Sequence, residues 1–362
     1  MRSVCPEEGM SLAWFDALKC ALLVIAVGMS CIGQAAADDA SDMRLGAYRH
    51  GLALSLQQST SPRDWALGSQ LLEMRPDTGV ALRQRALILQ KAAQAAPADV
   101  LVQTLWANLP LNDSFCRAAH GCLDRRTALA RLDPGNVVGW LSVLDHAWKK
   151  GDARGTEVTL RHLADAVRYN EHLGLAVAAW LDIFRRYPAP KSQAFAGYEA
   201  STVASDELDL TFSEAVATVT PPVASLVDAC RKSKRPHAGA KRFEICGKIA
   251  RVMMGRSQSL LGRMFGVEIL RAAQAGNKAD VSMVRTVTWQ YEQYQPIAAS
   301  MANNANARQN HLILIEQTDS EMQAVQFELG IAGIPLTPPD GWKQTVNGKQ
   351  IDPLDDPFAQ VP

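Results

Sequence analysis

The sequence has no excess of either charge and few aromatic residues. It holds 37 Lys and Arg against 37 Asp and Glu, a formal net charge of zero, and only 6% of its 362 residues are Phe, Trp or Tyr. Proteins that bind nucleic acid generally carry a basic excess or stripe, so this balance argues against that class. The composition of 48% hydrophobic and 20% charged residues argues against disorder, a collagen-like chain and a multi-span membrane protein.

Motifs for common enzyme chemistries are also missing. The sequence contains no phosphate-binding glycine loop, HExxH pair, GxSxG elbow or CxxC redox pair. Its histidines are scattered; His146 and His162 fall on consecutive expected helices, where they could meet or serve surface and capping roles. Several glutamates could act as a general acid, but none is distinguished from a solvated helix glutamate: Glu157, Glu171, Glu268, Glu292 and Glu316. We therefore predict no catalytic residue, no metal and no cofactor.

The N-terminal segment indicates export. Residues 21–32 carry no charge and are followed by small residues, with Ala at both Ala35 and Ala37. This pattern predicts a signal peptide, residues 1–37, cleaved after Ala37, and a periplasmic or secreted protein that starts at Met1 or Met10. The apolar run is shorter than the about 20 residues of a membrane span. The alternative is an inner-membrane anchor, with residues 21–37 retained.

Cysteine usage agrees with an oxidising compartment. Three of the seven cysteines lie in the targeting segment, and the mature chain keeps two local pairs: Cys116 with Cys122, and Cys230 with Cys246. We predict these two disulfides, although four cysteines permit three connectivities. A metal site formed by Cys116, His120 and Cys122 is the alternative for the first pair, but it lacks a fourth ligand and CxxC spacing.

Helical periodicity dominates the mature chain and predicts an all-α fold of irregular antiparallel helix hairpins. Ser61 and Asn136 are expected N-caps, with Pro62 at the first helical position. Further helices are expected over residues 123–132, 136–151, 152–170, 171–186, 212–219, 223–231, 241–254, 257–275, 281–298 and 307–329. Periodicity fades in a linker, residues 188–206, which we place between a helical domain of residues 38–187 and a second helical region of residues 207–330.

The C-terminal residues 331–362 form a proline-rich tail. Within it, Asn347 and Gly348 are flanked by short runs that look extended. Such a pair predicts a β-hairpin, because both turn positions need a positive φ.

Four tryptophans recur at intervals typical of helix-pair repeats. Trp65, Trp106, Trp140 and Trp180 are separated by 41, 34 and 40 residues. The best unit covers residues 133–166 and includes the run Asp133-Pro-Gly-Asn136, followed by Trp140 and then Gly151-Asp152. It resembles a degenerate tetratricopeptide repeat, a pair of antiparallel helices that commonly opens with Asp-Pro-x-Asn and an aromatic residue.

The resemblance implies two faces for the helix that carries Trp140. Trp140, Val143 and Ala147 would pack between the paired helices. The other face, with Leu141, Asp145, Trp148 and Lys149, would line a groove that holds a peptide. Alternatively, Leu141 and Trp148 pack against the preceding hairpin, and only Asp145 and Lys149 meet water.

One segment has a strong local excess of basic residues. Six basic residues lie between Cys230 and Cys246: Arg231, Lys232, Lys234, Arg235, Lys241 and Arg242. They form a candidate patch for an anionic envelope component, with a solvated interhelical loop as the alternative. No aromatics are interleaved among them, which argues against single-stranded nucleic acid.

These observations predict an exported helical-repeat protein that binds a protein or peptide partner as a scaffold or assembly factor. The first alternative is an all-α envelope hydrolase with an unidentified catalytic carboxylate. The second is an interaction protein tethered to the membrane by its N-terminal segment.

Overall fold

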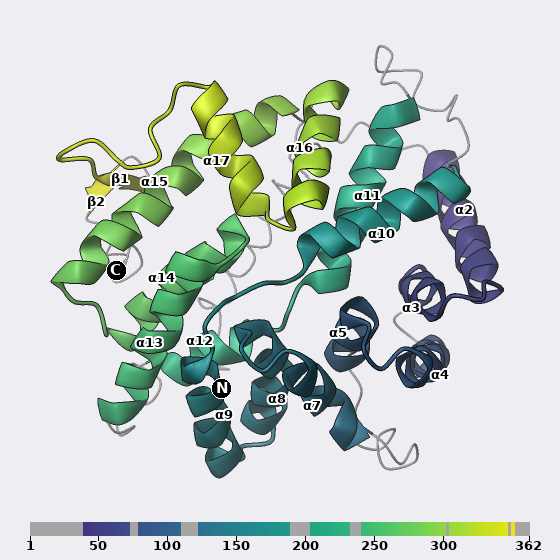
Figure 1. Ribbon diagram of the computed structural model, residues 1–362, viewed down its shortest axis with the longest axis horizontal. Coiled ribbons are helices and arrows are strands. Elements are labelled where there is room, and N and C mark those ends of the chain that lie inside the picture. The colour runs from purple at the N-terminus through teal and green to yellow at the C-terminus, as the bar shows by residue number, and fades with distance from the viewer. Residues whose placement is uncertain are drawn as a thin grey trace, which may run out of the picture.

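The computed structural model describes residues 39–72, 79–109, 122–188, 203–231, 240–301, 304–346 and 349–351. Over these ranges the chain forms fifteen helices and one two-stranded sheet (Figure 1). The all-α prediction is therefore confirmed. The signal peptide, Cys116 and residues 352–362 lie outside the described residues, so the expectations about them stay predictions.

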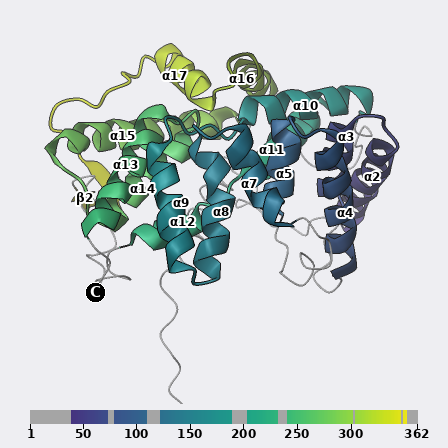
Figure 2. The same cartoon turned by 60° about the horizontal axis from the view of Figure 1, so that its bottom comes forward.

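The first part of the chain forms a row of helices in which each packs on the next. They are α2 (Asp39–Gln57), α3 (Pro62–Gln70), α4 (Gly79–Ala95), α5 (Val100–Asn108), α7 (Cys122–Leu132), α8 (Val137–Lys149) and α9 (Ala153–Asp165). Both predicted caps are in place: Ser61 accepts a hydrogen bond from the Asp64 amide, and Asn136 accepts one from the Val138 amide. In Figure 2 the helices α3, α4, α5, α8 and α9 stand side by side.

After α9 the chain leaves the helical conformation earlier than predicted. Helix α9 ends at Asp165 rather than near Asn170, and α10 (Leu173–Arg186) begins after Glu171. The connection forms backbone hydrogen bonds with other segments instead. The Val137 amide donates to the Arg168 carbonyl (3.0 Å), and the Gln258 amide donates to the Tyr169 carbonyl (3.0 Å).

Helix α10 then packs beside the N-terminal helices. Arg186 binds both carboxylate oxygens of Asp64 on α3, at 2.8 and 2.9 Å. The next helix, α11 (Val203–Val219), packs on α10, and the buried Trp180 of α10 donates to Thr218 of α11 (2.9 Å). Figure 1 shows α10 and α11 beside α2–α5, whereas α12 (Ala224–Cys230) and α13 (Ala240–Arg256) lie near α8 and α9.

This path means that the predicted linker does not separate two cores. One core joins α2–α5 with α10, α11, α16 (Ala305–Thr318) and α17 (Glu321–Ile331). The other joins α7–α9 with α12, α13, α14 (Leu260–Ala273) and α15 (Lys278–Met301). Residues from both sides of the linker contribute to each of these two cores. A third, smaller cluster lies wholly beyond the linker and consists of Leu260, Tyr294, Met322, Val325 and Leu329.

The single helix predicted over residues 307–329 is in fact two helices. Between α16 and α17, Asp319 adopts a left-handed conformation with φ of 49°, and Ser320 caps α17 by accepting from the Gln323 amide. The apolar periodicity continues across this break, which is why it predicts one helix.

The predicted β-hairpin is present at the end of the described chain. Strand β1 (Gln344–Val346) pairs antiparallel with β2 (Lys349–Ile351), with Thr345 opposite Gln350. The two turn residues, Asn347 and Gly348, lie outside the described residues.

Candidate functional site

The four residues predicted to line a groove on α8 do not share an open surface. Leu141 is fully buried in the second core, and Trp148 is half-buried. Asp145 accepts a hydrogen bond from Ser225 Oγ of α12 (2.6 Å) and pairs with Lys149 Nζ (2.8 Å). Helix α12 therefore covers this face, and of the four residues only Lys149, with a side chain 70% exposed, is largely open to a partner.

The opposite face of α8 packs on α9. The Trp140 ring stacks on His162 of α9, with centroids 4.2 Å apart and an interplanar angle of 7°. Ala147 is buried. The structure thus places Trp140 between the paired helices, as the repeat pattern implies, and gives His162 this ring as its partner rather than His146.

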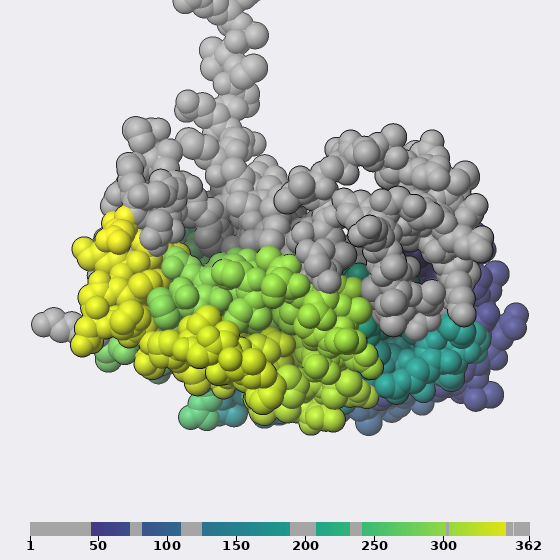
Figure 3. All heavy atoms as spheres, turned by 90° about the horizontal axis from the view of Figure 1, so that it is seen from above, coloured from purple at the N-terminus to yellow at the C-terminus, as the bar shows by residue number. Residues whose placement is uncertain are grey.

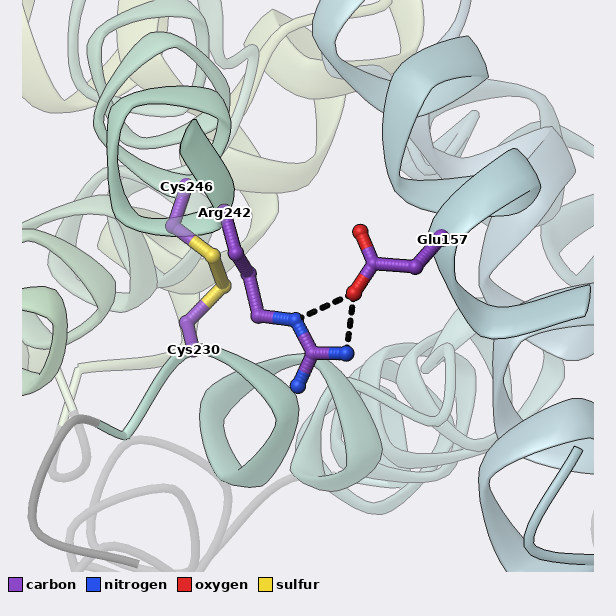
Figure 4. Close-up of a disulfide and its surroundings, with 4 residues drawn as sticks. All are labelled: Glu157, Cys230, Arg242 and Cys246. Atoms are coloured by element: carbon purple, nitrogen blue, oxygen red, sulfur yellow. Dashed lines mark hydrogen bonds and ion pairs between the residues drawn. A yellow bond between two sulfur atoms is a disulfide. The ribbon is translucent and has the colours of Figure 1, made fainter. Parts of the chain in front are cut away.

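The described part of the basic segment is largely neutralised by the protein itself. Arg242 is bound to Glu157 of α9 through Nε (2.6 Å) and a second guanidinium nitrogen (Figure 4). Arg231 lies 3.9 Å from a carboxylate oxygen of Glu268. Lys241 is exposed, and Lys232, Lys234 and Arg235 lie outside the described residues. The two arginines therefore act in ion pairs within the protein, and any anion patch falls to the three lysines and Arg235.

The predicted disulfide between Cys230 and Cys246 is present. Both cysteines are fully buried, their Cα atoms are 5.7 Å apart, and the bond joins the end of α12 to α13. Figure 4 shows it beside the Arg242–Glu157 pair. Together these contacts fix α12, α13 and α9 to one another. The pairing of Cys116 with Cys122 cannot be placed, because Cys116 lies outside the described residues.

A small pocket that the sequence does not predict lies where three distant segments meet. Glu171 precedes α10, Ser259 caps α14, and Glu321 is the first residue of α17. These residues line a pocket with a cavity volume of about 50 Å³. Apart from Thr220, the rest of its lining is apolar: Leu173, Phe212, Val216, Val219, Pro221 and Leu261.

Both carboxylates of the pocket are held at the N-terminus of α14. Ser259 Oγ donates to Glu171 Oε1 (2.6 Å) and accepts from the Gly262 amide (2.9 Å). The Leu260 amide donates to Glu321 Oε2 (2.9 Å). The partial positive charge of a helix N-terminus favours negative groups, which explains how the fold tolerates two buried carboxyl groups so close together.

Burial dominates the acid–base behaviour of this pair. It raises the pKa of Glu171 to about 7, and the nearby Glu321 carboxylate adds to the increase. Burial also raises the pKa of Glu321, although His311 opposes it. A carboxyl group with a pKa near neutrality can donate a proton, as a general acid must.

Of the five glutamates considered as acids, only Glu171 lies in this pocket. Glu157 and Glu268 face arginines, and Glu292 and Glu316 are half-buried on α15 and α16. The sequence alone does not single out Ser259 or Glu321, because the contacts that define the site join residues 88 and 61 positions apart. Contacts between residues so far apart leave no pattern in the local sequence.

The outward face of α17 is a second feature that the sequence pattern does not predict. It consists of four uncharged residues at helical spacing: Gln323, Phe327, Gly330 and Ile331. Phe327 is 54% exposed and Ile331 is 73% exposed. Figure 3 shows this part of the chain, in yellow, open on the surface. We call these four residues the α17 face.

No family model, curated protein or solved structure matches this chain. Within the described ranges, no group of three or more His, Cys, Asp or Glu side chains is placed to hold a metal ion. No single helix of the described chain is long and apolar enough to cross a membrane, but Leu208–Val219 and Ala224–Cys230, bent by 47°, meet the length and composition criteria together.

Proposed function

We propose that this protein is exported and binds a protein or peptide partner, as a scaffold or assembly factor built from tetratricopeptide-like helix hairpins. The α17 face carries the binding proposal. The solvent side of a helix in a globular protein ordinarily bears charged residues. Here it bears a phenylalanine and an isoleucine, four residues apart and both more than half exposed.

The partner should therefore present apolar surface to Phe327 and Ile331. Exposed apolar patches on soluble proteins mark interaction sites, and large apolar side chains at the centre of an interface contribute most of its affinity. The zero net charge gives no support for nucleic acid as the partner. No cofactor is needed for this activity.

The binding proposal is tested by capture from an envelope extract of the source organism. We expect wild type to retain a partner that the double variant Phe327→Ser, Ile331→Ser does not retain. Leu87→Ser is the matched control, because Leu87 is a single apolar residue on α4 that is 58% exposed. Capture of the same partners by the double variant would refute this role of the α17 face.

Two features support export. The N-terminal segment has the pattern of a cleaved signal peptide. In addition, disulfides such as Cys230–Cys246 persist in oxidising compartments. An intact mass beginning at Asp38 is expected for the mature protein. A full-length protein in the membrane fraction would favour the tethered alternative instead.

A hydrolase is the second candidate function, and the pocket favours it specifically. Glu171 combines burial, a pKa of about 7 and a position facing a cavity. The cavity of about 50 Å³ is far smaller than the roughly 300–1,000 Å³ of typical ligand pockets, so only a small group could enter it. Release of reducing ends from envelope glycans by wild type, abolished in Glu171→Gln, would support it. Equal release by both proteins would exclude Glu171 as the acid.

A further inference from the structure

The segment that follows α17 is held against α15 although most of it is exposed. Residues 334–341, which we call the strap, have the sequence Ile-Pro-Leu-Thr-Pro-Pro-Asp-Gly, and of these only Ile334 and Pro338 are half-buried. Gly333 and Gly341, at its two ends, have φ values of 70° and 73°, a conformation that favours glycine. The strap thus has a glycine in a left-handed conformation at each end and little buried surface of its own.

Side chains of α15 bind the backbone of the strap. Trp289 Nε1 donates to the Pro335 carbonyl (2.8 Å), and Gln290 Nε2 donates to the Leu336 carbonyl (2.9 Å). Arg285 donates to the Pro339 carbonyl (3.3 Å). The three donors lie at positions 285, 289 and 290, so one side of α15 supplies them all. We call these three residues the α15 site.

Trp342, the residue directly after the strap, adds an aromatic contact to Trp289 of the α15 site. The rings of Trp289 and Trp342 meet edge to face, with centroids 5.5 Å apart. Proline-rich segments have few amide donors and a restricted, extended backbone, and their carbonyls are therefore what a binding site can recognise. Aromatic side chains with donors directed at such carbonyls are the way in which proteins bind proline-rich peptides.

The strap does not satisfy the α15 site completely. Gln290 is only 3% exposed, yet within the described chain its Oε1 atom has no hydrogen-bond partner. The buried Nε atom of Arg285 is also without a partner there. A buried polar atom without a hydrogen bond is unfavourable, so a segment that supplied an amide and a carbonyl at these two atoms would bind better than the strap does.

We propose that the α15 site is a binding site for a proline-rich, extended peptide segment of a partner protein, which displaces the strap. The strap occupies the site as an intramolecular ligand and sets the threshold that the partner must exceed. This site is separate from the α17 face, so the proposal does not depend on the function proposed above.

The test must weaken the strap, because a tethered segment competes at an effective concentration on the order of millimolar. In the full chain, the strap variant Pro335→Ala, Pro338→Ala, Pro339→Ala keeps every carbonyl but loses the rigidity of the prolines. The probe is a fluorescent nonapeptide with the wild-type sequence of residues 334–342, followed by anisotropy. We expect the strap variant to bind it at least tenfold more tightly than wild type does.

Substitution of the site separates specific from general binding. Adding Trp289→Phe to the strap variant should weaken binding at least tenfold. Trp140→Phe is the matched control, because Trp140 Nε1 also donates to a proline carbonyl, that of Pro134 (3.1 Å), but on α8. Equal peptide binding by wild type and a folded strap variant, or equal losses from Trp289→Phe and Trp140→Phe, would overturn the proposal. A wild-type dimer that Trp289→Phe dissociates would also overturn it, with a second copy as the occupant.

Hydrogen exchange of the wild-type chain keeps the test decisive if the strap variant does not fold. The amides of Ile334 and Trp342 donate to the Leu329 carbonyl (2.9 Å) and the Pro339 carbonyl (3.2 Å). They should exchange through local opening, much faster than the core amides of α14, and faster still in excess peptide. Exchange of these amides only through global unfolding would show that the strap is a fixed part of the fold and would overturn the proposal.

Discussion

At the scale of single residues, the Glu171 carboxyl group is the least expected feature of the molecule. It is buried beside Glu321, and it is stabilised by the Ser259 hydroxyl and the N-terminus of α14. These dipoles offset only part of the cost of removing a charge from water, which is why its pKa remains raised. The protonated form is therefore the one that the folded state prefers.

This preference makes stability depend on pH. The folded-state pKa of Glu171 is about 7, above its ordinary value of 4.5, so between these values the folded state holds a proton that the unfolded chain has released. The contribution of Glu171 is therefore fully present below pH 4.5, declines as pH rises to 7 and is constant above that. We expect Glu171→Gln to be more stable than wild type at pH 8, by up to about 3 kcal/mol.

The measurement is urea unfolding at several pH values between 4.5 and 8. Glu244→Gln is a suitable control, because Glu244 is an exposed glutamate on α13. The unfolding free energy of Glu171→Gln should still depend on pH, since burial also raises the pKa of Glu321. Unfolding free energies that follow the same pH dependence in wild type and Glu171→Gln would rule out this account.

At the scale of helices and strands, the sequence predicts the features that depend on contacts between residues close together in the chain. Ser61 and Asn136 cap helices because their side chains reach amides two or three residues ahead, a contact visible in the sequence. The break at Asp319 was missed for a complementary reason. The Asp319 carboxylate accepts from the Leu175 amide (3.3 Å) and from Asn170 (3.2 Å), and both donors are more than 140 positions away.

The same distinction explains the site residues. Cysteine spacing was sufficient to predict the Cys230–Cys246 bond, because both members are close in sequence and only a few pairings are possible. The predicted groove on α8 is not open, because α12 packs on α8 and its Ser225 binds Asp145, and the repeat pattern of residues 133–166 contains no information about α12. The pocket, too, depends entirely on distant segments.

Close packing of α13 and α14 depends on one glycine. A Cβ atom on Gly266 would lie 2.7 Å from the Met254 amide nitrogen and 2.8 Å from the Ala250 carbonyl oxygen. Because backbone cannot move aside cheaply, Gly266→Ala should separate the two helices and reduce the unfolding free energy by about 1–3 kcal/mol. Gly51→Ala is the control: nothing lies within 4 Å of its added Cβ, and alanine favours the helix. Chemical denaturation measures the unfolding free energy of both variants. Equal changes in the two would contradict the close approach of α13 and α14 at Gly266.

The disulfide between α12 and α13 should contribute through the unfolded chain. Its members are 16 positions apart, a loop for which cross-linking is worth about 3 kcal/mol. We expect the double variant Cys230→Ala, Cys246→Ala to lose about this much in urea unfolding. Alkylation of the wild-type protein in urea, without reductant, should leave these two cysteines unmodified, because unfolding exposes both and only the bond then protects them. Modification of both would show that the bond does not form.

At the scale of the whole molecule, the two cores share the chain rather than divide it. The row α2–α9 comes first in the chain, α10 then packs beside α3 through the Arg186–Asp64 contact, and α11 packs on α10. The first core includes Ala215, Val219, Leu312 and Ile315, all from beyond the predicted linker. The second includes Leu141 and Leu160 together with Ile249 and Ile269. Within the described chain, neither part forms either of these two cores alone.

The interleaving therefore predicts one cooperative unit. Residues 38–188 expressed alone should lack a cooperative thermal transition and bind hydrophobic dyes, because α10 would lose α11 and α16, and Trp180 would lose both burial and its bond to Thr218. Co-expression with residues 189–362 is the control, since the two pieces together can rebuild both cores. A cooperative melt of residues 38–188 near the wild-type Tm would instead mean that the first half folds as a domain. Because the cores share residues across the linker, we expect the co-expressed pieces to copurify and to melt in a single transition.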